Sequence, residues 1–333
     1  MKKPTDLGRL LRLFLVEYLP QQRNASAGTV RAYRDALKLM ICFVADAQKC
    51  SVADLAICEV DRTAVLDFLT SIETDRRNCV TTRNHRLAAI RSFFRFVSAN
   101  QAEAVEQCAQ ILAIPLKRGE SKPADYLTMD EVQAVLERIP TNTKEGRRHD
   151  VLLRFLYNTG ARVQEAIDVH DSDLRLDSPG NVLLRGKGQK QRLCPLWADT
   201  SARLTRLLAE RSNEAANSGL VFTNRVGKSL TRSGVRYILT KYVKAAVAQC
   251  PSLRGKRIHP HTMRHTTAMH LLQSGVDLNT IRCWLGHASI TTTNRYVEID
   301  LEMKRRALDG LTVPLETDVA KADDALLAWL ESL

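Results

Sequence analysis

The chain has 333 residues, of which 44% are hydrophobic and 26% charged, and this balance excludes a disordered or fibrous protein. A chain of this length favours two domains of ordinary size. It contains no run of about 18 apolar residues, so we expect no membrane-spanning helix and no membrane partner.

The net charge of +12 is concentrated in the middle of the chain. Residues 113–310 hold 32 Lys and Arg against 20 Asp and Glu, whereas residues 311–333 hold one against five. A positive field of this kind attracts a polyanion, and nucleic acid is the usual one. A basic surface that serves solubility alone is the alternative.

The eight cysteines are scattered, without a Cys-x-x-Cys pair, and no histidine cluster has the spacing of metal ligands. This pattern disfavours a structural zinc site and a disulfide framework. It fits a protein of the reducing cytoplasm, and we expect neither a metal nor a cofactor.

Apolar residues recur at helical spacing through the first part of the chain. They predict an N-terminal bundle of four or five helices over residues 1–112, with segments at about 7–18, 30–44, 62–72 and 80–98. The last segment carries Arg83, Arg86 and Arg91 between its apolar positions. These cations predict either a solvated helix face or a face that contacts DNA phosphates.

Residues 113–125 lack apolar periodicity and contain two prolines, a glycine and three cations, which predicts a linker. Thr128 and Glu131 then form a capping-box pattern that opens a second domain, over residues 126–310. Helical patterns dominate this domain. The stretches NVLLR and RLCPL around GKGQKQ predict a small hairpin, and GLVFT is a candidate for a further strand. The predicted fold is mainly α with one small sheet.

Three stretches of the second domain hold residues suited to phosphate chemistry. In NTGARVQEAIDV, Arg162 opens a helix, near backbone N–H groups that attract anions. In HPHTMRHTTAMHLL, His261 and Arg264 are three residues apart and therefore share one helix face. In CWLGHASITTTNRYVEID, a lone tyrosine, Tyr296, follows His287 by nine residues.

Taken singly, these residues fit a core histidine or a surface arginine, but together they resemble the signature of a known family. TGARVQE, GKGQKQRLCPL and the stretch from His259 to Val297 are similar to tyrosine recombinases, the phage integrase family, of XerC/XerD or transposon-encoded type. With weaker similarity nearer the N-terminus, the match covers most of residues 26–300. The resemblance implies a SAM-like N-terminal DNA-binding bundle and a mostly α catalytic domain with a small antiparallel sheet. It also implies that a tail, residues 311–333, docks on a neighbouring subunit or on its own domain.

The resemblance also implies the roles of site residues. The implied catalytic set is Arg162, Lys187, His261, Arg264, His287 and Tyr296. Tyr296 is the nucleophile, the two arginines hold the phosphate, and Lys187 protonates the leaving 5′-hydroxyl. Arginine suits this phosphate-binding role because its charge is permanent and its guanidinium N–H groups donate in pairs. Lys190 and Arg192 are phosphate contacts or the substitute acid, and Glu165 orients side chains by hydrogen bonding.

The implied function is site-specific recombination, in which DNA is cut and rejoined through a 3′-phosphotyrosyl intermediate and a Holliday junction without metal or ATP. The implied partners are double-stranded DNA at recombination sites and further subunits in a tetramer, identical or from related recombinases. Alternatives are a type IB topoisomerase, a hairpin-forming resolvase, or a catalytically degenerate DNA-binding regulator. The expected DNA contacts are Arg83, Arg86, Arg91, Lys117, Lys122, Lys190 and Arg192.

Overall fold

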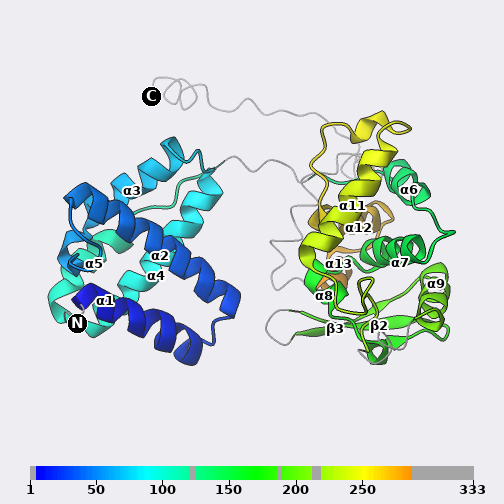
Figure 1. Cartoon of the computed structure of the whole chain (residues 1–333), viewed down its shortest axis with the longest axis horizontal. Coiled ribbons are helices and arrows are strands. Elements are labelled where there is room, and N and C mark those ends of the chain that lie inside the picture. Colours follow the sequence, from blue (N-terminus) through cyan, green and yellow to red (C-terminus); the bar gives the residue numbers. More distant parts are fainter. Residues whose placement is uncertain (1–4, 120–124, 187–189, 212–218, 287–333) are drawn as a thin grey trace, which may run out of the picture. The chain divides into compact units, whose positions relative to one another are not determined.

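The computed structural model describes residues 5–119, 125–186, 190–211 and 219–286. The chain forms two compact units, Met1–Ser121 and Lys122–Leu333, which Figure 1 draws in sequence colours. Each unit has a hydrophobic core of its own. Among the described residues, no helix has the length and apolar character needed to cross a membrane.

All regular elements described in the first unit are helices, as predicted. They are α1 (Asp6–Arg12), the π-helical η1 (Leu13–Gln22), α2 (Ala27–Gln48), η2 (Ile57–Glu59), α3 (Arg62–Thr74), α4 (Val80–Asn100), η3 (Ala102–Ala104) and α5 (Val105–Leu112). Helix α4 packs against α2, α3 and α5. This helix therefore forms the centre of the bundle.

Aromatic rings hold α4 in place. The ring centroid of Phe14 lies 5.4 Å from that of Phe93 and 5.5 Å from that of Phe96. Such ring pairs stabilise a core beyond the area that they bury. Because the apolar side of α4 is used in this way, Arg86 and Arg91 remain at the half-buried border of the same helix.

The second unit combines helices with one small sheet. Its elements are α6 (Met129–Glu137), α7 (Lys144–Thr159), α8 (Val163–Ile167), η4 (Asp171–Asp173), β1 (Leu174–Arg175), β2 (Asn181–Arg185), β3 (Gln191–Pro195), α9 (Ala198–Ala209), α11 (Arg232–Ala246), η5 (Pro251–Leu253), α12 (Pro260–Gln273) and α13 (Leu278–Leu285). The strands pair antiparallel in the order β1-β2-β3, so the predicted hairpin is confirmed.

The capping box that opens the second unit is present, whereas the further strand is not. The Thr128 backbone N–H donates to Oε2 of Glu131 at 2.9 Å, and the Thr128 hydroxyl accepts from the Glu131 N–H.

The stretch GLVFT forms only isolated bridges, at Leu220 and at Thr223. Gly219 has a positive φ and a turn follows at Asn224, so the extended run is too short for a strand.

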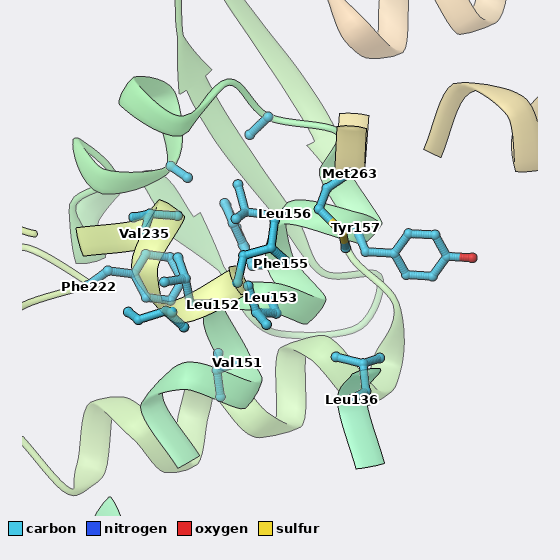
Figure 2. Packing of buried hydrophobic residues seen from close by; sticks show 14 of the residues in the cluster. Leu136, Val151, Leu152, Leu153, Phe155, Leu156, Tyr157, Phe222, Val235 and Met263 are labelled. Atoms are coloured by element: carbon cyan, nitrogen blue, oxygen red, sulfur yellow. The ribbon is translucent and has the colours of Figure 1, made fainter. Parts of the chain in front are cut away.

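Helix α7 is the central element of the second unit. From His149 to Thr159 every residue except Arg154 is buried, as expected of a helix that is packed on all sides. Figure 2 shows side chains of α7, Phe155 among them, packed with Phe222 and Val235. Helices α9 and α12 also pack against α7. The C-terminal end of α7 is therefore a rigid base for the residues that follow it.

Candidate active site

Arg162 lies where α7 ends and α8 begins. Gly160 closes α7 with a φ of +57°, and a Cβ at this position would lie 2.5 Å from Cδ2 of Leu285. Only glycine fits both the left-handed backbone and this close approach of α13. Arg162 then becomes the N-cap of α8, and its backbone N–H donates to Oε2 of Glu165 at 2.9 Å.

Glu165 is a buried carboxylate held by two arginines. Its Oε1 accepts from Nη1 of Arg162 at 2.7 Å, and its Oε2 accepts from Nη2 of Arg192 at 2.8 Å. Burial alone would raise the pKa of Glu165, but the hydrogen bonds and charges of Arg192 and Arg162 outweigh it and hold that pKa below its ordinary value. The carboxylate therefore stays charged at neutral pH. It anchors one edge of the Arg162 guanidinium, whose side chain remains 40% exposed.

Arg264 is almost fully buried, at 1% exposure. Its Nη1 donates to the carbonyl oxygen of Gly160 at 2.8 Å, and its Nη2 donates to that of Leu285 at 2.6 Å. These carbonyls lie at the C-terminal ends of α7 and α13, where helices leave acceptors unsatisfied and carry partial negative charge. One guanidinium on α12 therefore joins the ends of two other helices.

His261 lies at the exposed start of α12, one turn before Arg264. Its ring centroid is 4.8 Å from that of His265 in an edge-to-face arrangement. Desolvation, followed by the positive charges of Arg264, His259 and Arg162, lowers the pKa of His261 below its ordinary value. The ring is therefore largely neutral at pH 7 and offers one donor and one acceptor nitrogen.

The structure brings three predicted catalytic residues, Arg162, His261 and Arg264, to the end of α7. The other three, Lys187, His287 and Tyr296, lie outside the described residues. In the sequence, Lys187 directly follows Gly186 at the end of β2, and His287 directly follows Gly286 at the end of α13. Within the described ranges, no three His, Cys, Asp or Glu side chains gather as metal ligands.

The predicted DNA contacts of the first unit differ in their surroundings. Arg86 and Arg91 form no ion pair with any residue that the structure describes. Lys117 forms a 2.6 Å ion pair with Glu73. Arg83 is only 4% exposed and donates to the carbonyl oxygen of Pro115, so its guanidinium holds the start of the linker. We therefore leave Arg83 out of the proposed DNA contacts.

The remaining predicted DNA contacts belong to the second unit or to the part of the linker outside the described residues. Lys190 is exposed at the start of β3, whereas Lys122 lies outside the described residues. Arg192 is largely buried, because its Nε donates to the Trp284 carbonyl oxygen at 2.8 Å while Nη2 is bound to Glu165. Sequence reasoning missed the Trp284 contact, since a backbone carbonyl has no residue-type signature.

Two family models match this chain. The family model described as "Phage integrase family" matches residues 125–303, and "Phage integrase, N-terminal SAM-like domain" matches residues 13–101. The first match covers more than half of the chain and includes every predicted catalytic residue. The chain belongs to the phage integrase family.

Relatives and solved structures support the same assignment. The chain is 37% identical to "Putative integrase/recombinase y4rC" of Sinorhizobium fredii, with all of both chains covered. It is 32% identical to tyrosine recombinase XerD of Oceanobacillus iheyensis, over 85% of this chain and 91% of that one. A structure of the XerH recombinase bound to its difH substrate superposes with a TM-score of 0.69 at 24% identity, over 88% of this chain and 83% of that one. The predicted family and the mainly α fold are confirmed.

We expect Arg264→Ala to lower the free energy of unfolding by about 2–6 kcal/mol, because two buried carbonyl groups lose their donor at about 1–3 kcal/mol each. Arg162→Ala removes an ion pair that is exposed on the arginine side, and because Glu165 keeps Arg192 as a partner the change should cost only about 1 kcal/mol. Urea unfolding followed by tryptophan fluorescence measures both. Equal losses would show that Arg264 does not hold the helix ends.

Proposed function

We propose that the protein is a site-specific DNA recombinase that cuts and rejoins strands through a covalent 3′-phosphotyrosyl intermediate and a Holliday junction. The observation that carries this proposal is the grouping of Arg162, Arg264 and His261 at the end of α7, in a chain of the phage integrase family. XerC and XerD tyrosine recombinases among the relatives support it.

The two arginines stabilise the charge that develops on the scissile phosphate. A phosphodiester under attack gains negative charge on its oxygens, and guanidinium groups offer permanent charge with paired donors. Arg162 is already oriented by Glu165, so its exposed edge meets the phosphate with little reorganisation. Arg264 adds a fixed positive charge from inside the fold.

Histidine, tyrosine and lysine side chains carry out the proton transfers. The Tyr296 phenol has an ordinary pKa of about 10, so it needs a proton acceptor before it attacks phosphorus. His261, largely neutral at pH 7, can accept that proton or donate a hydrogen bond to the phosphate, and His287 adds a second such group. The attack forms a 3′-phosphotyrosine and breaks the bond to the 5′-oxygen, to which Lys187 gives a proton. The phosphotyrosyl ester retains the bond energy for religation.

The proposed substrate is a duplex with a specific recombination site. Residues 1–112 and the linker 113–125 bind it together with the catalytic domain, 126–310, and the cations Arg86, Arg91, Lys117, Lys122 and Lys190 contact its phosphates. The active form is a tetramer on two such sites, of identical or related subunits, in the cytoplasm. In it the tail, 311–333, docks on a neighbouring subunit or on its own domain.

We expect Tyr296→Phe to abolish cleavage and to leave DNA affinity nearly unchanged, because the change removes only the nucleophilic oxygen. A nicked suicide substrate should trap the wild type as a covalent adduct, seen as a band shift on a denaturing gel. An adduct with the Phe variant would assign the nucleophile to another residue. Relaxation of unrelated supercoiled plasmid by the wild type would indicate a topoisomerase instead.

We expect the joint change of Arg86, Arg91, Lys117 and Lys122 to Ala to flatten the slope of log affinity against log salt by roughly two to four, since each phosphate contact contributes about 0.9. The Glu73 pair of Lys117 should lower its share, because DNA must replace that pair. Binding of a cognate duplex across a salt series measures the slope.

A matched control removes the same charge from exposed cations on other elements of the first unit, namely Arg9, Arg12, Lys49 and Arg62. The control should keep a slope closer to that of the wild type. Equal slopes for the two fourfold variants would mean that the first unit attracts DNA by net charge rather than by these contacts.

A further inference from the structure

Arg192 on β3 is linked to two other elements of the site. Its Nη2 donates to Oε2 of Glu165 and its Nε donates to the carbonyl oxygen of Trp284, both at 2.8 Å. Only 11% of its side chain is exposed. We propose that Arg192 is a positioning residue, which holds Glu165 and hence Arg162 in place and does not contact DNA. This inference rests on the proposed recombinase function.

A guanidinium suits this position better than any other cation. Its planar N–H groups reach a carboxylate and a carbonyl in two directions at once, whereas a lysine ammonium is a single point charge. The Glu165 side chain is 3% exposed, and a buried carboxylate that loses a partner is strongly disfavoured. Arg192 therefore stabilises the charged state of Glu165, on which the orientation of Arg162 depends.

The Arg192 contacts also fix the stem of the β2–β3 hairpin. Strand pairing continues to Arg185↔Gln191, and the Gly186 N–H then donates to the Lys190 carbonyl oxygen at 2.7 Å. A Cβ built on Gly186 would lie 3.1 Å from Oε1 of Glu165, so the stem lies directly against that carboxylate. The residue after Gly186 in the sequence is Lys187, the proposed acid.

On its other side, Arg192 binds the end of α13. The carbonyls of Trp284 and Leu285 are neighbours in the chain, and Arg192 binds the first while Arg264 binds the second. Gly286 ends this helix with a φ of +66°, and a Cβ there would lie 3.1 Å from Cδ of Arg192. Two arginines from separate elements therefore satisfy successive carbonyls at one helix terminus.

The pH dependence of cleavage distinguishes positioning from a purely structural role. Among the residues that the structure describes, the charged groups that face Glu165 are Arg162, at the N-cap of its own helix, and Arg192, on β3. Burial acts to raise the pKa of Glu165, and the Arg192 hydrogen bond is the strongest influence that lowers it. Loss of Arg192 therefore raises this pKa, and a protonated Glu165 no longer holds Arg162 through an ion pair. The acid limb of the cleavage profile must then move to higher pH.

The experiment compares full-length Arg192→Gln and Arg185→Gln on a nicked suicide substrate over a range of pH. Arg185 is a matched control, because it lies on the same hairpin and forms a 2.6 Å pair with a buried carboxylate other than Glu165, that of Asp173. We expect Arg192→Gln to cleave about 10²-fold more slowly with unchanged DNA affinity. Its acid limb should move to higher pH, whereas Arg185→Gln should keep the wild-type limb.

Two further measurements separate the possible roles of Arg192. In a substrate with a 5′-bridging sulfur, the leaving group departs without protonation. This substrate should therefore restore cleavage by the Lys187→Ala variant but not by the Arg192→Gln variant. The double variant Glu165→Gln/Arg192→Gln leaves no unpaired buried carboxylate. Its loss of rate should therefore be smaller than the product of the two single losses.

The outcomes are distinct. A wild-type rate for Arg192→Gln would overturn the proposal. Rescue of this variant by the sulfur substrate would also overturn it, because Arg192 would then be the acid. Weaker DNA binding with an unchanged pH profile would overturn it too, because Arg192 would then be a phosphate contact. If Arg192→Gln does not fold, Arg192→Lys, which can reach only one acceptor, should still cleave more slowly than the wild type. Absence of a covalent adduct with the wild type would contradict the recombinase function itself.

Discussion

The site depends on one buried guanidinium. Arg264 binds the carbonyl oxygens of Gly160 and Leu285, and so joins the ends of α7 and α13 to α12. This arrangement requires a glycine at position 160, because a Cβ there would overlap Leu285. The same turn makes Arg162 the N-cap of α8. One buried side chain with two backbone partners therefore determines where Arg162 lies.

Three arginines of the site are used differently because they are buried differently. Arg264 is 1% exposed and holds helix ends, the Arg192 side chain is 11% exposed and holds Glu165, and the Arg162 side chain is 40% exposed and free to meet a phosphate on its outer edge. One carboxylate, Glu165, balances the latter two. Under the proposed function, Arg162 therefore meets the phosphate already oriented by Glu165, which Arg192 holds in turn.

Apolar periodicity, turn residues and helix-capping residues predicted most of the fold. Apolar spacing predicted helices in both units but named no segment at α5 or α9, the GKGQKQ turn located the hairpin, and Thr128 with Glu131 located the start of the second unit. The same reasoning was wrong for GLVFT, since β propensity says nothing about whether a partner strand is available. Sequence periodicity also could not predict that Arg83 is buried. A cation on an amphipathic helix is expected to be exposed unless its tertiary partners are known. The partners of Arg264 were invisible for a related reason: they are backbone atoms.

The central claim is that strand transfer proceeds in two steps through a tyrosyl ester, with the charge on the phosphate stabilised by Arg162 and Arg264. The most direct test places a non-bridging sulfur of known configuration at the scissile phosphate and determines the configuration in the recombinant product. Each in-line displacement at phosphorus inverts the configuration, so attack by Tyr296 followed by attack of a 5′-hydroxyl predicts overall retention. Overall inversion would mean a single direct transfer and would contradict the account.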